Sequence, residues 1–484
     1  MDLTKIYGIE FDETIPNGGE TRILDAAGIQ NDYVIGNRFQ NGGRNDFDSA
    51  YPFGAIRLCN LKLEDGKKVL TYENEPGFDR TGRNGNVMVE IPKFYSRREK
   101  TGNMERWMVS GACHEGFSLE PCFLRDGKEL PCIYVGAYNS HDLGGGVYSA
   151  SGNYPDVMLP ITHFEETYAA CGYDPYDFAV MLCLQRLCVI ELGTRNLKSV
   201  LGGVCMMKYF SRVTENNSIV DFGPNRVTTN MSGRNTYFAP GNDIGIGHAE
   251  RDLTQIRTVT KVSVNPEHTD WVDIFYDGED LSGSLTIHGD ATYGVPQRNG
   301  ATDKLPYHTG RCDYQAPLAP EWNALISPFR YRGIENLWGS VWEFVSGLRM
   351  HKLQYYYTFD PALYGSSREL WNKYPISAPE QHLLPDHDPD GPHWISSLGM
   401  DDSDPLVHVP VKLESGVLGM YYDSVLNAYH NRDYSNKPVD PDREYSTATG
   451  GAWDHKFASP FLYRCFMTRT SVNWLYSNRL CLRK

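Results

Sequence analysis

The stretch that decides the fold runs from Gly333 to Phe344 and reads GIENLWGSVWEF. Its large aromatic residues Trp338, Trp342 and Phe344 all fall at even positions, as on one face of a strand, where alternate side chains lie together. Gly333 and Gly339 interrupt that spacing. Large rings beside glycine indicate a strand packed closely against another backbone. We therefore expect this stretch to build the core.

Length and composition describe a globular, loop-rich protein. The 484 residues predict two or three domains, and 40% hydrophobic with 22% charged residues is enough for a substantial core. Tyrosine is abundant, with 31 residues beside 46 glycines and 28 prolines. Because tyrosine is favoured both in strands and at recognition surfaces, this composition favours a β-rich protein with binding loops.

The net charge and the cysteine pattern indicate which kind of partner and which cellular compartment to expect. The formal net charge of −15 disfavours a nucleic-acid partner, which would require a basic surface. Eleven cysteines are scattered without paired spacing, so we expect reduced thiols, as in a protein made in a bacterial cytoplasm. The sequence starts without a signal-peptide pattern and has no long apolar run, so no membrane insertion is expected.

One convincing helix is expected from Tyr176 to Leu192, where the sequence is apolar almost all round. Asp174 is expected to cap it, Asp177 to complete a capping box, and Gly193 to end it. Before this helix, short strands are expected at Ile6–Phe11, Val87–Tyr95 and Cys132–Tyr138, and a glycine linker at residues 144–146.

These elements divide the chain at about residue 145. Residues 1–145 are predicted to form a β-rich attachment or stem module, and residues 146–484 a second domain. Between about 205 and 305 a β-rich insertion is expected, with strands at Thr258–Val264, Trp271–Tyr276 and Gly283–His288.

The stretch Gly333–Phe344 resembles the signature G-x-E-N-x-W-G-N-V-W-E-W of the formylglycine-generating-enzyme (sulfatase-modifying factor) branch of the C-type-lectin fold. The sequence GGAW at residues 450–453 resembles a strand of the same branch, and SNRL at residues 477–480 resembles its ending. The chain looks most similar to phage and prophage tail proteins of this branch, including variable proteins of diversity-generating retroelements. The resemblance implies an α+β fold, with a C-type-lectin-like C-terminal domain that carries the β-rich insertion and follows the β-rich N-terminal module.

In such proteins the last strands and loops present the binding face, here residues 450–484. Carried over by position, the resemblance implies these ligand-binding residues: Asp454, His455, Phe457, Arg464, Phe466, Met467, Ser471, Asn473, Leu475 and Tyr476. Phe461, Cys465, Trp474 and Leu480 are expected in the core instead. The resemblance leaves open whether this face is diversified, because adenine-directed mutagenesis of an Asn codon does not produce Lys456, Met467 or Trp474.

Catalysis is not expected. Oxidases of this branch bind copper through two closely spaced cysteines, but Pro460 and Thr470 stand where a partner of Cys465 would be, and Cys481 is too distant in sequence. The histidine and glutamate spacing of the related iron enzymes is also missing. A metal-dependent oxidase or formylglycine-generating-type enzyme remains the alternative, as does a bacterial surface-exposed binding protein.

No cofactor is required by this interpretation, although calcium is one open alternative. Asp386, Asp388 and Asp390 alternate before Gly391, a spacing of carboxylates that suits an oxygen-liganded calcium ion. The competing interpretation is a solvated acidic turn.

The resemblance predicts a non-enzymatic receptor-binding protein, or adhesin, at the tip or fibre of a phage tail. The expected partners are a host cell-surface receptor, either protein or glycan, and other phage tail proteins. Adhesins of this kind are commonly homotrimers, in which avidity strengthens weak single contacts. The expected location is the virion tail.

Overall fold

The computed structural model describes residues 1–15, 19–32, 43–142, 146–203, 219–229, 243–247, 255–280, 286–288, 298–312, 314–315, 325–326, 328–352, 354–377, 393–415, 426–427, 443–451, 459–461, 463–472 and 476–484.

The protein is β-rich, with 41% of the chain in strands and 14% in helices, which is compatible with a mostly β or α+β fold. The N-terminal part begins with an antiparallel sheet of order β2-β1-β7-β6-β8. Its strands are β1 (Ile6–Asp12), β2 (Thr21–Leu24), β6 (Tyr95–Thr101), β7 (Met104–Ser110) and β8 (Ser118–Leu119). The predicted strand at Ile6–Phe11 is confirmed by β1.

A second antiparallel sheet joins the two ends of the chain, in the order β14-β35-β11-β5-β3-β4. Its strands are β3 (Arg57–Glu64), β4 (Lys67–Tyr72), β5 (Asn86–Pro92), β11 (Cys132–Gly136), β14 (Asp174–Pro175) and β35 (Leu480–Leu482). The segment predicted as one strand, Val87–Tyr95, is divided between β5 and the start of β6.

The predicted boundary near residue 145 does not separate two cores. Because β35 pairs with β11, residues 1–145 share a sheet with the C-terminus, and one apolar core includes residues from both sides of the boundary. Residues 144 and 145 of the predicted glycine linker lie outside the described residues.

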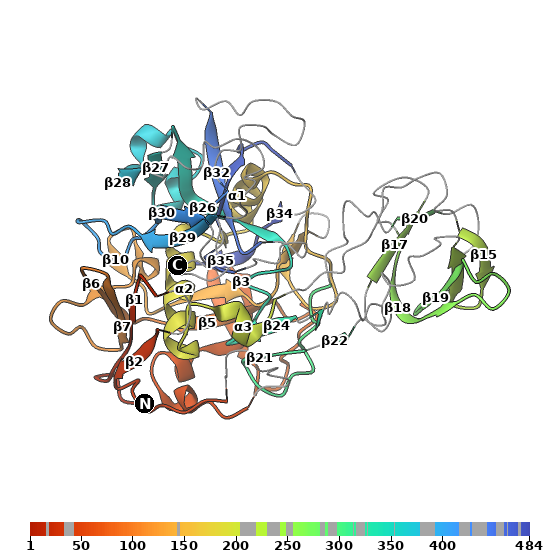
Figure 1. Cartoon of the computed structure of the whole chain (residues 1–484), viewed down its shortest axis with the longest axis horizontal. Coiled ribbons are helices and arrows are strands. Elements are labelled where there is room, and N and C mark those ends of the chain that lie inside the picture. Colours follow the sequence, from red (N-terminus) through yellow and green to blue (C-terminus); the bar gives the residue numbers. More distant parts are fainter. Residues whose placement is uncertain are drawn as a thin grey trace.

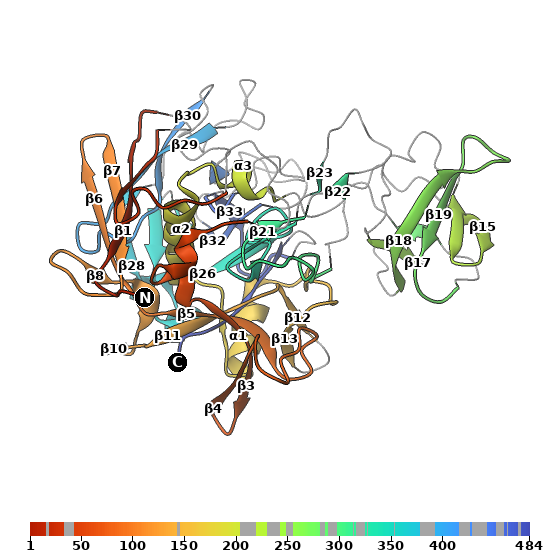
Figure 2. The ribbon, with the colours of Figure 1, turned by 90° about the horizontal axis from the view of Figure 1, so that it is seen from below.

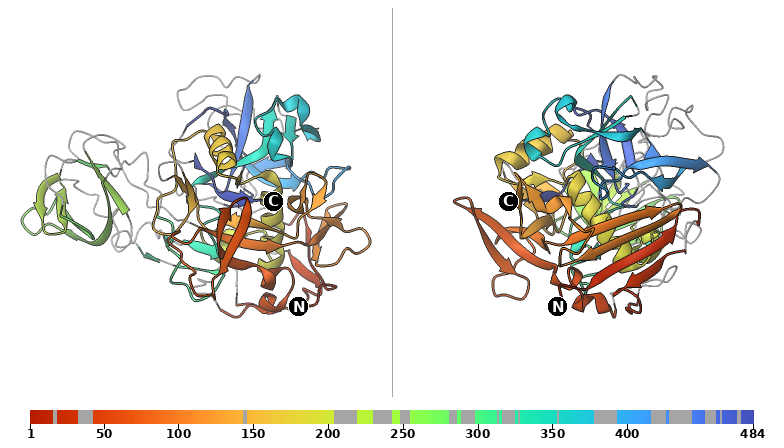
Figure 3. Two further views of the ribbon diagram at one scale, coloured as in Figure 1. Left: turned by 180° about the vertical axis from the view of Figure 1, so that it is seen from behind. Right: turned by 90° about the vertical axis from the view of Figure 1, so that its left-hand side faces the viewer.

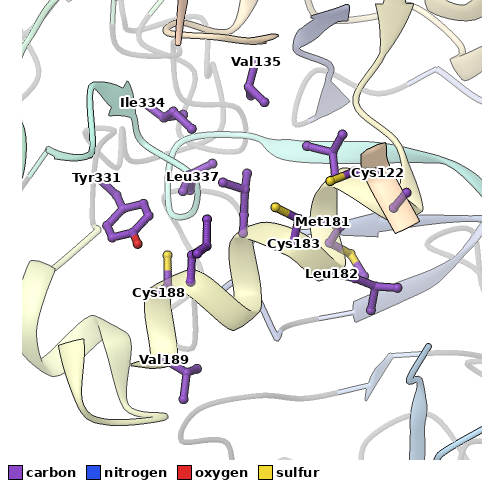
Figure 4. Packing of buried hydrophobic residues seen from close by; sticks show 14 of the residues in the cluster. Cys122, Val135, Met181, Leu182, Cys183, Cys188, Val189, Tyr331, Ile334 and Leu337 are labelled. Atoms are coloured by element: carbon purple, nitrogen blue, oxygen red, sulfur yellow. The ribbon is translucent and has the colours of Figure 1, made fainter. Parts of the chain in front are cut away.

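The helix α2 (Phe178–Leu192) forms the centre of this core, and all of its residues are buried. Figure 3 shows the N-terminal strands on one side of the helix and the C-terminal strands on the other. Figure 4 shows Cys188 of α2 beside Tyr331, and Cys183 beside Cys122.

The start of α2 corrects one detail of the sequence prediction. The helix is capped by Asp177, whose carboxylate accepts a hydrogen bond of 2.9 Å from the backbone N–H of Val180. Asp174 lies in β14, where its carboxylate accepts from Arg125 at 2.7 Å, so it is not available as the cap. Gly193 ends the helix as predicted, in a left-handed conformation (φ 70°) that glycine adopts without strain.

The C-terminal part is a seven-stranded sheet of order β28-β27-β26-β32-β33-β31, in which β34 also pairs with β26. Its strands are β26 (Trp342–His351), β27 (Gln354–Tyr357), β28 (Asn372–Ser377), β31 (Leu426–Asn427), β32 (Glu444–Thr449), β33 (Tyr463–Met467) and β34 (Tyr476–Ser477). The helix α1 (Ile161–Ala170) packs against this sheet through Phe164, whose ring lies 6.2 Å from that of Phe344. Figure 1 shows β26, β27, β28 and β32 with α1 on the side of the main body away from the N-terminus.

Residues 219–288 contain a separate β-sheet that stands apart from the main body in Figures 1 and 2. Its strands are β15 (Ile219–Gly223), β16 (Arg226–Thr229), β17 (Asp243–Gly247), β18 (Gln255–Val264), β19 (Val272–Tyr276) and β20 (Thr286–His288). Val227 and Ile274 are fully buried in a small core of its own. The strands predicted at Thr258–Val264 and Trp271–Tyr276 are present as β18 and β19, while residues 283–285 of the third predicted strand lie outside the described residues.

The remaining elements are short. They are α3 (Leu197–Leu201), β9 (Leu124–Arg125), β10 (Lys128–Glu129), β12 (Ser140–Asp142), β13 (Val147–Ser149), β21 (Gly310–Arg311), β22 (Tyr314–Gln315), β23 (Leu325–Ile326), β24 (Phe329–Tyr331), β25 (Ile334–Glu335), β29 (His393–Leu398) and β30 (Pro410–Ser415). Among the described residues, none of the helices has the length and apolar character needed to span a membrane.

The stretch Gly333–Phe344 is buried throughout, as predicted, but it is two strands joined by a turn. Trp342 and Phe344 lie in β26, while Trp338 lies in the turn and donates to the carbonyl of Gly202 at 2.8 Å. Gly339 has a φ of 79°, and a Cβ atom there would lie 1.3 Å from the carbonyl oxygen of Gly203. The close approach expected from glycine beside aromatic rings is therefore confirmed at Gly339.

We predict that Gly339→Ala lowers the free energy of unfolding by about 2–5 kcal/mol, since it adds both left-handed strain and a clash with backbone. Gly365→Ala is the matched control, because Gly365 is exposed and a Cβ atom there would meet nothing within 4 Å. Chemical denaturation of the two variants measures the difference. Equal stability of both variants would contradict this account of the turn.

Candidate recognition surface

The C-terminal segment, residues 450–484, contributes the strands β33 and β34 to the seven-stranded sheet. β32 lies between β26 and β33 in antiparallel pairing, and β34 runs parallel to β26. β35 then crosses to the N-terminal sheet, between β14 and β11. The segment predicted to bind a ligand is thus anchored at several points in the structural frame.

The two ends of residues 452–458 are held close together. The backbone N–H of Gly339 donates to the carbonyls of Gly450 and Gly451, at 3.2 and 3.0 Å, and the N–H of Ser459 donates to Gly450 at 3.2 Å. The carbonyl of Pro460 accepts from the Thr449 hydroxyl at 2.8 Å. These bonds join Gly450 and Gly451 to the turn at Gly339, and they join Ser459 and Pro460 to Gly450 and Thr449.

A compact turn follows β33. The hydroxyl of Ser471 contacts that of Thr468 at 2.7 Å and accepts from the Thr468 backbone N–H at 3.1 Å, while the Ser471 N–H donates to the Thr468 carbonyl at 3.0 Å. Between them, Arg469 pairs with Glu165 of α1. Val472 is exposed at the end of the turn. The turn is therefore fixed by its own hydroxyls and by an ion pair to the helix.

The structure places some of the predicted ligand-binding residues. Ser471 is half-buried in the turn, and the backbones of Arg464 and Phe466 belong to β33. Those outside the described residues are Asp454, His455, Phe457, Asn473 and Leu475, together with the candidate calcium ligands Asp386, Asp388 and Asp390.

Met467 and Tyr476 correct the prediction, because both side chains are buried, at 7% and 0% exposure. Met467 packs in the apolar cluster under α1. The ring of Tyr476 stacks on Trp342 at 6.1 Å and lies 5.0 Å from Phe344. Both residues belong to the frame and not to the ligand-binding set.

Three of the four residues expected in the core are confirmed there. Phe461, Cys465 and Leu480 are fully buried, while Trp474 lies outside the described residues. Burial raises the pKa of the Cys465 thiol to about 12, and it also raises the pKa of the Cys481 thiol. In the metal-free protein these thiols are therefore protonated at neutral pH and are poor nucleophiles.

Sequence reasoning missed a polar cluster beside the turn. Arg349 of β26 pairs with Glu444 of β32 at 2.7 Å, and Arg368 approaches the same carboxylate at 3.4 Å. The Arg349 guanidinium also lies 3.9 Å above the ring of Trp371. An arginine within a mostly apolar strand could have indicated a buried ion pair at Arg349. Its partner Glu444 could not be found from the sequence, because it lies 95 positions away and no spacing rule connects the two residues.

No model of a known protein family matches the sequence, and no curated protein matches it. The described residues contain no group of three or more His, Cys, Asp or Glu placed to hold a metal ion. The lectin-like assignment therefore remains a prediction from the motif.

We predict that Arg479→Met lowers the free energy of unfolding by about 3–5 kcal/mol, because it leaves the Glu343 carboxylate buried without its counter-charge. Arg479 donates to Glu343 at 2.7 Å, and both side chains are at most 2% exposed. Arg83→Met, in which an 81% exposed side chain is changed, should leave stability nearly unchanged. Similar losses in the two variants, measured by chemical denaturation, would contradict the anchoring role.

We also predict that a thiol reagent at pH 8 modifies exposed Cys113 in the native protein but reaches Cys465 and Cys481 only after unfolding. Peptide mass spectrometry with and without denaturant distinguishes the sites. Rapid native labelling of Cys465 would instead favour the oxidase alternative.

Proposed function

We propose that this chain is a non-enzymatic receptor-binding protein of a phage or prophage tail tip or fibre, which displays a ligand-binding face on a C-type-lectin-like domain. The observation that carries the proposal is the hydrogen bonding of the residues that flank positions 452–458, Gly450 and Ser459. Gly450 accepts hydrogen bonds from both Gly339 and Ser459, so the predicted contact residues lie, in sequence, between two fixed points.

Anchoring of this kind supports binding for a physical reason. A recognition segment whose ends are already ordered loses less conformational entropy when it meets a ligand. The aromatic and charged residues predicted there, including Phe457 and His455, are of types that bury large area or form polar contacts at interfaces.

The placement of Cys465 and Cys481 in two different sheets also favours binding over oxidase chemistry. A copper-binding cysteine pair needs thiolates that can approach each other. Cys465 instead contacts the Thr447 hydroxyl at 3.4 Å in the sheet, and Cys481 lies in β35, which pairs with β11 and β14.

The assembly completes the proposal. The N-terminal part attaches the chain to other tail proteins, and three copies present three faces to a host cell-surface receptor. Several weak contacts then act together, which raises the apparent affinity far above that of one site.

We predict that the triple change Phe457→Ala, Arg464→Ala and Phe466→Ala reduces adsorption to host cells by about tenfold or more, as expected when hot-spot residues are truncated. Adsorption of the purified protein is measured by fluorescence on cells, with thermal unfolding recorded in parallel.

The matched control is Val69→Ala, Arg83→Ala and Leu124→Ala, which changes exposed residues in the N-terminal part. It should leave adsorption unchanged. If the first variant unfolds like the wild type and still adsorbs fully, the assigned face is wrong.

A further inference from the structure

A row of five side chains crosses the seven-stranded sheet beside the turn at residues 468–471. The strand register pairs Lys373 with Tyr356, Tyr356 with Arg349, Arg349 with Ser446, and Ser446 with Met467. Directly opposed residues of antiparallel strands share a face of the sheet. These five residues, which we call the cross-strand row, therefore run from the β28 edge to the predicted recognition segment.

The outer end of the row is accessible and cationic. Lys373 is exposed and makes no ion pair with any described residue, and Tyr356 is half-buried. Arg368 lies over the Tyr356 ring at 5.9 Å from its centroid, and its ion pairs to Glu444 and Glu369 are long, at 3.4 and 3.7 Å. Ion pairs of this length leave the guanidinium able to bind another anion.

The inner end of the row has hydrogen-bonding groups with no partner in the described part of the chain. Arg349 Nε and the Ser446 hydroxyl are both buried and unpartnered, in residues that are 2% and 1% exposed. Burial, together with the nearby charge of Arg469, lowers the pKa of Arg349 to about 10. Among the described residues, the inner end therefore holds a buried guanidinium N–H and a buried hydroxyl without partners, although Glu444 and Glu165 lie nearby.

The chemistry of the row selects among anions. Arginine and lysine would bind a carboxylate, while the carboxylates of Glu444 and Glu369 would accept hydrogen bonds from hydroxyl groups. The half-buried Tyr356 ring offers an apolar surface to a sugar ring. A polyanion without hydroxyls offers no hydrogen-bond donors to these two glutamates, whose carboxylates then only repel it.

We propose that the outer end of the cross-strand row, Lys373 and Tyr356, together with the adjacent Arg368 and Glu444, binds the carboxylate-bearing sugar units of an acidic surface polysaccharide. Carboxylates contact Lys373 and Arg368, and sugar hydroxyls contact Glu444. This inference rests on the proposed receptor-binding function and names the ligand class of the region next to the recognition segment.

The test uses the full chain and three polymers: polygalacturonate, neutral dextran and inorganic polyphosphate. Calorimetry at physiological salt should detect binding of polygalacturonate alone. The double variant Arg368→Glu, Lys373→Glu should weaken that binding about tenfold or more, because two attractive contacts become repulsive. Arg83→Glu, Lys67→Glu makes the same charge change at exposed positions of the N-terminal part and should bind like the wild type.

Ser446→Ala supplies a second check. Removing an unpartnered buried hydroxyl should leave thermal stability equal or higher. Polygalacturonate binding should be unchanged, because the proposed contacts lie at the outer end of the row. The proposal is overturned if polygalacturonate does not bind, if polyphosphate binds equally well, or if both double variants lose affinity alike.

The outcomes separate this inference from the proposed function. If polygalacturonate does not bind but the Phe457, Arg464 and Phe466 variant loses adsorption, the receptor-binding function stands and the ligand class is wrong. If polygalacturonate binds through Arg368 and Lys373 but neither set of changes affects adsorption, the receptor-binding function fails and the sugar site stands.

Discussion

The arrangement of the C-terminal segment depends on one buried ion pair, Arg479 with Glu343. Arg479 also donates to the carbonyl of Gly136 at 2.9 Å and to that of Glu335 at 2.8 Å. One side chain therefore joins the C-terminus to β26, β11 and β25. In a dry core a charged group without its partner is strongly destabilising, so this pair permits one arrangement of these strands and disfavours others. Arg483 acts in the same way on the cap of α2, through Asp177 at 2.6 Å.

Local patterns predicted the parts of the fold that local physics controls. The all-apolar run predicted a buried helix, and Gly193 predicted its end, because a left-handed residue there needs no Cβ. The error at Asp174 shows the limit of this reasoning. Asp174 and Asp177 are both good caps by residue type, but Asp174 is held in β14 by pairing with β35 and by Arg125, whereas Asp177 keeps one carboxylate oxygen for the helix. That competition comes from residues far away in sequence.

The candidate site was less predictable for the same reason. In β33, Tyr463 and Cys465 are buried in the central core, whereas a register shift against β32 places Met467 in the cluster under α1. The mixed charged and aromatic sequence of this segment did not reveal that division. Arg349 shares a face with Tyr356 and Ser446 only because the register of two strand pairs aligns them. Register is set by the whole sheet and not by the residues that it brings together.

The burial of Met467 and Tyr476 shows which residues of the C-terminal segment hold the fold together and are not accessible to a ligand. Tyr476 stacks on Trp342, and Trp342 begins β26 directly after the turn that Gly339 makes possible. Changes at Tyr476 would therefore disturb the same packing that holds Gly450 in place. Positions 454, 455 and 457 lie, in sequence, between Gly450 and Ser459. The hydrogen bond that joins these two residues is made by backbone groups, so it does not depend on the side chains at the positions between them. Under the proposed function, side chains at those positions would therefore change binding specificity without loss of the bonds at Gly450 and Ser459, whereas a change at Tyr476 would also lower stability.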